Sequence, residues 1–103
     1  MDLLSRIKRL ILADAYAFSR QALDQMDQDG ITELDVLESV ANAQFVRTKR
    51  STSTMRRIDR ERVCIIESFS FGGILIYTKG AIKKDGDSEQ FYFFISSKRS
   101  TTA

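Results

Sequence analysis

The spacing of the hydrophobic residues changes near residue 43, and this change limits the chain to a small set of folds. Before residue 43, apolar residues such as Leu3, Ile7 and Leu10 recur at three- and four-residue intervals, as in an amphipathic helix. After it, they alternate with polar residues or form short apolar runs, which is typical of strands. Helices followed by strands predict an α+β domain, in which N-terminal helices pack on one face of a small antiparallel sheet.

A chain of 103 residues has room for one core, so residues 1–103 are predicted to be a single domain. The helical part, 1–43, is expected to divide at Gly30, because glycine is favoured just past the end of a helix. One helix is predicted to run from about Phe18 to Asp29. Thr32 and Asp35 have the spacing of a capping box and predict the start of another.

The sheet is predicted to occupy residues 44–99. An Asp-Gly step in the sequence KDGDSE favours a tight hairpin between the last two strands. A charged connection of unassigned structure follows the first strand. The four expected strands are Gln44–Thr52, Arg62–Phe69, Ile74–Lys83 and Gln90–Ser97.

The two halves of the chain differ in charge. Residues 1–43 carry four Lys or Arg and eight Asp or Glu, whereas residues 44–103 carry twelve and six. The net charge of +2 therefore combines −4 in the helical part with +6 in the strands, and an anionic partner is expected to bind the strands.

Histidine is absent, and Cys64 is the single cysteine. A zinc site and an internal disulfide are therefore excluded, and we expect neither a metal nor a cofactor. The unpaired thiol fits a reducing compartment, so the expected location is the cytoplasm. No apolar run approaches the roughly 20 residues of a membrane span, so no membrane contact is expected.

A short loop in the hairpin predicts a register in which Tyr77 faces Ser96 and Lys79 faces Phe94. Since side chains alternate along a strand, one face of the hairpin should carry Tyr77, Lys79, Ser96 and Lys98. The other face should pack on the helices with the apolar residues Ile74, Ile76, Ile82, Phe91, Phe93 and Ile95.

A tyrosine beside two lysines suits phosphodiester chemistry, because cations stabilise the charge that develops on a pentavalent phosphorane. Glu67, inside an apolar strand, is either a solvent-facing residue or a general base. Tyr92 and Phe94 are candidates to stack on bases. Alternatively, the lysines and the tyrosine form an ordinary solvated strand face. The residues expected to contact a nucleic-acid backbone are Arg47, Lys49, Arg50 and Arg99, with Arg56, Arg57, Arg60 and Arg62 extending the basic surface.

The stretch FSRQALDQMDQDGITELDVLESV, followed by FVRTKRS, YTKG and ISSKR, resembles small bacterial toxins of the RelE superfamily, nearest to the MqsR-like branch. The resemblance covers about residues 15–100 and implies a RelE/barnase-like fold. It also implies a metal-independent endoribonuclease (mRNA interferase), in which a 2′-hydroxyl attacks the adjacent phosphate. The implied partners are messenger RNA, free or bound to the ribosome, and a cognate antitoxin protein.

Carried over to this chain, the resemblance implies that Tyr77, Lys79 and Lys98 are catalytic. Tyr77 would act as base or position the nucleophile, and the two lysines would stabilise the phosphorane. Lys49 or Arg50 matches the basic residue of the first strand. Gln21 stands where many relatives have histidine, and strand Arg62–Phe69 has no clear counterpart of the MqsR-like glutamine. The alternatives are therefore a non-catalytic member of the fold that binds RNA or protein, and an RNA-binding or adaptor domain outside any toxin pair.

Overall fold

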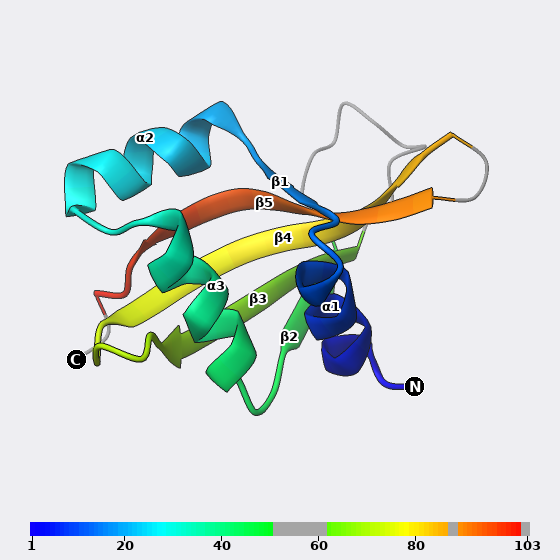
Figure 1. Ribbon diagram of the computed structural model, residues 1–103, viewed down its shortest axis with the longest axis horizontal. Helices are drawn as coiled ribbons and strands as arrows, with labels where there is room; N and C mark the ends of the chain where they lie inside the picture. Colours follow the sequence, from blue (N-terminus) through cyan, green and yellow to red (C-terminus); the bar gives the residue numbers. More distant parts are fainter. Residues whose placement is uncertain (51–61, 87–88, 102–103) are drawn as a thin grey trace.

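The computed structural model describes residues 1–50, 62–86 and 89–101 (Figure 1). This part of the chain forms three helices on one face of a five-stranded sheet with the strand order β1-β5-β4-β3-β2. The α+β class is confirmed. The elements are α1 (Leu3–Leu12), β1 (Tyr16–Phe18), α2 (Arg20–Asp29), α3 (Glu33–Asn42), β2 (Arg47–Arg50), β3 (Arg62–Phe69), β4 (Leu75–Asp85) and β5 (Glu89–Arg99).

Local signals begin and end the helices, and two of them, Gly30 and the Thr32–Asp35 pair, were predicted. Ser19 caps α2 by accepting a hydrogen bond from the Ala22 backbone N–H at 3.0 Å. Gly30 ends that helix in the left-handed conformation, with φ 67°. Thr32 and Asp35 exchange hydrogen bonds of 3.0 and 2.9 Å, which completes the predicted capping box of α3.

β1 was not expected, and it makes the sheet mixed instead of antiparallel. It runs parallel to β5, with Phe18 opposite Phe94, while the other three strand pairs are antiparallel. The rings of Phe18 and Phe94 stack with their centroids 4.5 Å apart. Three residues are too few to show an alternating pattern, and the spacing of Phe18 to the next apolar residues matched a helix.

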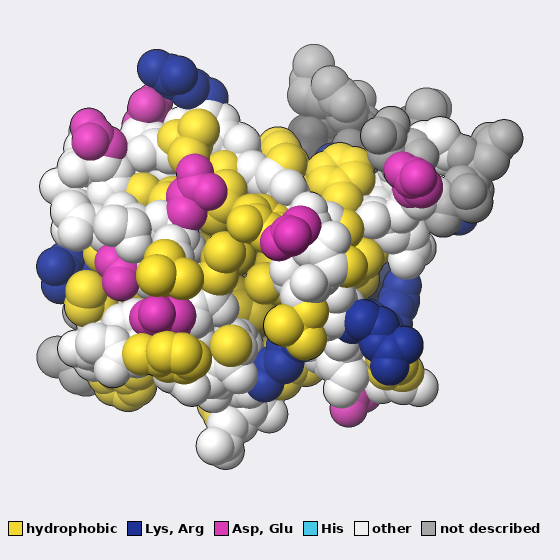
Figure 2. All heavy atoms as spheres, in the orientation of Figure 1, with side chains coloured by type: hydrophobic (Ala, Val, Ile, Leu, Met, Phe, Trp, Pro, Cys, Tyr) yellow, Lys and Arg dark blue, Asp and Glu magenta, His cyan; other side chains and the backbone are white. Residues whose placement is uncertain are grey.

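The core lies between the helices and one face of the sheet. Each helix contributes a fully or nearly buried apolar residue, namely Ile7 from α1, Met26 from α2 and Val40 from α3. On the helix side of the molecule, apolar side chains gather where the helices meet the sheet (Figure 2). The residues of the sheet in this core are Cys64, Ile66, Ile76, Tyr92 and Phe94.

A β-bulge sets the register of the hairpin formed by β4 and β5. Tyr77 pairs with Lys98 and Lys79 with Ser96, but the next residue of β4, Gly80, pairs with Phe94. Ile95 is therefore an extra residue in β5, and the side chains on the two sides of it alternate in opposite phase. The predicted register, in which Tyr77 faced Ser96, is wrong by one residue between the turn and the bulge, where Asp85 pairs with Glu89, and by two residues beyond the bulge, where Tyr77 pairs with Lys98.

The one-residue difference in register between the turn and the bulge changes which aromatic residues enter the core. Tyr92 and Phe94, expected on the RNA-binding surface, are both fully buried under the helices. Phe91 and Phe93, expected in the core, pair with Lys83 and Ala81 on the other face of the sheet and are only partly buried. A difference of one residue in the pairing thus exchanges the two pairs of rings between the faces.

Gly80 is required by the position of Tyr92. A Cβ atom at residue 80 would lie 2.6 Å from the Tyr92 ring, which is fully buried and cannot move aside. Gly80→Ala should therefore lower the free energy of unfolding by about 1–3 kcal/mol, the usual cost of overpacking. Gly72→Ala is the control, because its Cβ would meet only Ser70 Oγ, at 3.8 Å, and we expect a change within about 0.5 kcal/mol. Urea denaturation measures both, and equal stabilities of the two variants would contradict this account.

Stability at alkaline pH should depend on Tyr92. Its hydroxyl is buried without a hydrogen-bond partner, and burial raises its pKa above the ordinary value near 10. Between pH 10 and the higher pKa of the folded state, only the unfolded chain loses this proton, so stability falls as pH rises. The loss is about 1.4 kcal/mol per pH unit, and below pH 10 no such loss occurs. Tyr92→Phe should remove this part of the decline in urea denaturations at pH 8, 10 and 11. An equally steep decline in the variant would show that other groups cause it.

Candidate functional site

The face of the sheet turned away from the three helices carries a group of charged residues and one tyrosine, which we call the far-face cluster. Strand alternation and pairing place Glu67, Tyr77 and Lys98 in one row across β3, β4 and β5. The neighbouring row contains Lys79, which pairs with Ile65, which in turn pairs with Arg47. The far-face cluster consists of Arg47, Lys49, Glu67, Tyr77, Lys79 and Lys98.

Glu67 is held by two hydrogen bonds. Arg47 Nη2 donates to its Oε1 at 3.1 Å, and the Ser100 hydroxyl donates to its Oε2 at 2.7 Å. The side chain of Glu67 keeps 30% of its exposure, so a ligand on this face can reach the carboxylate. Both bonds come from groups outside β3, and they fix the direction of the carboxylate.

Tyr77 lies between an anion and a cation. Its cross-strand neighbours are Glu67 on β3 and Lys98 on β5. The ammonium of Lys98 lies 5.5 Å from the centroid of the Tyr77 ring, in cation–π range. This contact keeps the Lys98 charge over the middle of the row, where it can also attract an anionic ligand.

The floor beside these charges is apolar. Ile65 is 7% exposed and Ala81 is fully buried, although neither belongs to the core under the helices. Interactions between charges are stronger beside such a low-dielectric surface than in open water. The far-face cluster combines four cations with one carboxylate, so its overall field favours an anion.

The structure brings together Tyr77, Lys79 and Lys98, the three residues assigned to catalysis from the sequence, and adds Arg47 and Lys49. It does not bring Arg50 or Arg99 to this face. Arg50 follows Lys49 and points to the opposite side, where it pairs with Arg62. Arg99 donates from Nε to the Asp29 carbonyl oxygen at 2.9 Å, at the end of α2. Arg56, Arg57 and Arg60 lie outside the described residues.

Three further positions differ from the expectation. Ser96, expected beside Lys79 on the hairpin face, is buried, and its hydroxyl donates to Gln25 Oε1 of α2 at 2.7 Å. Glu67 joins the cluster although it was not placed among the catalytic residues; its charge within an apolar strand was the signal. Ser100 also contacts the cluster, and its position after the last expected strand gave no signal. Gln21 lies exposed on α2.

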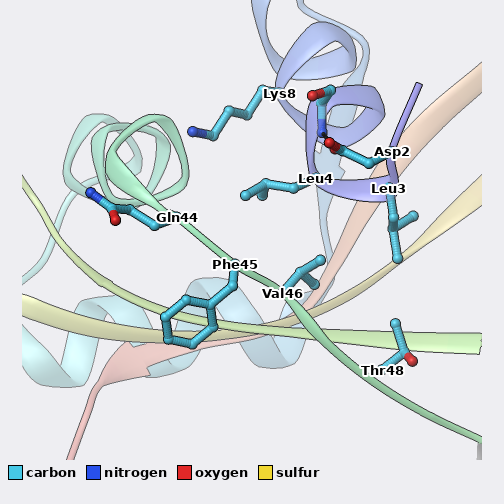
Figure 3. A pocket seen from close by; sticks show the side chains of 9 residues that line it. Asp2, Leu3, Leu4, Lys8, Gln44, Phe45, Val46 and Thr48 are labelled. Carbon is cyan, nitrogen blue, oxygen red and sulfur yellow. Dashed lines mark hydrogen bonds between the residues drawn. The ribbon is translucent and has the colours of Figure 1, made fainter.

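A hollow of about 380 Å³ lies between α1 and the residues that lead into β2 (Figure 3). Lys8 and Asp2 at its rim already have partners, since Lys8 Nζ donates to the Ala43 carbonyl oxygen at 2.6 Å and Asp2 caps α1. The exposed ring of Phe45 lies at its other side. Because both of its charged groups are engaged inside the chain, this hollow is a weaker candidate than the far-face cluster.

Within residues 1–50, 62–86 and 89–101, no three Cys, Asp or Glu side chains gather as a metal-binding group. The helices of the described ranges are all too short or too polar to cross a membrane. Searches with protein-family models, curated proteins and solved structures found no match for this chain.

The hydrogen bonds of Glu67 lie near the surface and should contribute little to folding. Glu67→Gln should change the free energy of unfolding by less than about 1 kcal/mol, as is usual for an exposed ion pair. Urea denaturation at neutral pH measures the change. A loss of several kcal/mol would mean that Glu67 holds the sheet together, and it would then be a poor candidate for chemistry.

Proposed function

We propose that the far-face cluster binds the backbone of RNA and cleaves it without a metal ion, by attack of a 2′-hydroxyl on the adjacent phosphate. In this proposal the protein is a RelE-type endoribonuclease. The observation that carries it is the row of Glu67, Tyr77 and Lys98, with Lys79 next to it. A carboxylate, a phenol and two ammonium groups on one face are the groups that this reaction needs.

Binding depends on the cations. Lys49, Lys79 and Lys98 come from three different strands, so they can follow successive phosphates of one strand of RNA. Phe91 and Phe93, which pair with Lys83 and Ala81 on this face, offer partly exposed rings for contact with bases. In this proposal Phe91 and Phe93 stack on bases, the role that the sequence suggested for Tyr92 and Phe94, which are buried.

Glu67 is the group best placed to accept the proton of the 2′-hydroxyl, since Arg47 and Ser100 orient its carboxylate. A bond forms between the 2′-oxygen and phosphorus, and Lys79 and Lys98 stabilise the negative charge of the phosphorane. The bond from phosphorus to the 5′-oxygen then breaks, and the Tyr77 hydroxyl donates a proton to the leaving oxygen. The products are a 2′,3′-cyclic phosphate and a 5′-hydroxyl, and water returns the proton from Glu67 to Tyr77.

A second candidate function is binding without cleavage. Both oxygens of Glu67 already accept hydrogen bonds, and engagement of this kind weakens a carboxylate as a base. In this case the same cations would bind RNA, or an acidic segment of a protein, with no reaction. An antitoxin, as implied by the family resemblance, would bind this face through acidic residues in either case.

Purified protein incubated with RNA in the presence of EDTA should produce fragments that end in a 2′,3′-cyclic phosphate. Lys98→Ala should slow cleavage about 100-fold or more, because it removes a cation that acts on the transition state. Arg20→Ala is the matched control; it removes a positive charge from α2, away from the far-face cluster, and should cleave like the wild type. RNA that the wild type binds but leaves intact would favour the second function. No binding at all would reject both.

A further inference from the structure

A second group of cations surrounds a pocket on the other side of the sheet. Arg6 of α1, Arg62 of β3 and Lys84 of β4 line a pocket of about 320 Å³, together with Gln90 of β5. The thiol-bearing Cys64, 2% exposed, lies at its inner wall. We call this site the basic pocket, and the described residues that line it include no carboxylate.

Strand pairing explains why these residues converge. Lys84 and Gln90 are directly opposite each other on β4 and β5, and Arg62 lies two residues from Cys64 on the same side of β3. All of them are on the helix side, because Cys64 belongs to the core under the helices. α1 covers this end of the sheet and adds Arg6.

The two arginines of the basic pocket lie close enough to Cys64, at its inner wall, to affect the thiol. Burial raises the pKa of the Cys64 thiol, and the positive charges of Arg62 and Arg6 oppose that rise. Both guanidinium groups are therefore near the same buried thiol. Arg50, which pairs with Arg62, adds a further positive charge beside the pocket.

Within the described part of the chain, no ion pair joins these cations to a carboxylate. Among the described residues, the two ion pairs join Arg20 to Asp24 and Arg47 to Glu67, and neither reaches the basic pocket. Figure 2 shows acidic side chains over α2 and α3, whereas Lys and Arg side chains gather beside α1. Like charges that share a concave site repel one another, and a bound anion would offset this repulsion.

We propose that the basic pocket binds a phosphate group. Two guanidinium groups, one ammonium and one amide offer more donors than the two oxygens of a carboxylate can use, and they suit the several oxygens of a phosphate. The volume is at the small end of ligand pockets, so it admits a phosphate with little attached to it. This ligand is either free phosphate or the terminal phosphate of an RNA.

The basic pocket is distinct from the far-face cluster. Lys84 points to the helix side, while its neighbour Lys83 pairs with Phe91 on the far face. A phosphate in the basic pocket would therefore occupy the side of the sheet opposite to the proposed cleavage site, and the proposal does not depend on cleavage.

The test is a titration of the isotope-labelled protein with inorganic phosphate at constant ionic strength, followed by NMR of the backbone amides. The amide signals of Arg62, Cys64, Lys84 and Gln90 should shift and saturate. Arg62→Gln and Lys84→Gln should each weaken binding about tenfold, the usual effect of losing a charge-assisted hydrogen bond. Lys83→Gln removes the same charge on the opposite face and should leave the dissociation constant unchanged.

Sodium chloride at the same ionic strength is the reference for non-specific effects. Equal shifts in chloride and phosphate, or wild-type binding by both pocket variants, would overturn the proposal. Lys98→Ala should not affect phosphate binding in this pocket, so the result is independent of the cleavage assay.

The source of the phosphate is tested with a short 2′-O-methyl oligoribonucleotide, which cannot be cleaved. If the 5′-phosphorylated form binds more tightly than the 5′-hydroxyl form, and Lys84→Gln removes the difference, the ligand is the end of an RNA. If the two forms bind equally while inorganic phosphate still saturates the pocket, the ligand is a small phosphate.

Discussion

The bulge at Ile95 determines the rest of the architecture. On one side of it, Tyr92 and Phe94 enter the core; on the other, Lys98 pairs with Tyr77 on the far face. Without the extra residue, β5 would continue in one phase, and the aromatic pair and Lys98 could not both keep their present faces. Gly80 lies opposite the bulge and accommodates the Tyr92 ring, so the two features depend on each other.

The sheet separates two positively charged regions that the sequence presents as one basic half. Alternation along β2 directs Lys49 to the far face and Arg50 to the helix side, and β4 does the same with Lys83 and Lys84. Adjacent cations therefore belong to different sites. The far-face cluster contains a carboxylate and a phenol and has the groups for chemistry, whereas the basic pocket contains donors and no base, which suits binding alone.

Local signals in the sequence predicted the helices well. Gly30 and the Thr32–Asp35 pair act within one or two turns of backbone, so their effect does not depend on distant residues. Alternation also predicted the common face of Tyr77, Lys79 and Lys98. The observed pairing of Tyr77 differs from the predicted one by two residues, and a shift of two residues leaves each side chain on its face. The bulge, β1 and the partners of Ser96 arise from contacts between segments far apart in the chain. Neither composition nor spacing contains that information.

The position of β5 has a consequence for folding. It follows the other described strands in the chain, yet it lies between β1 and β4 in the sheet and supplies two rings to the core. Without β5, β1 has no neighbour in the sheet, and α2 loses the strand on which it mainly packs. Contacts between the first and the last described strands therefore complete the sheet, so it does not form by pairing of neighbouring segments alone.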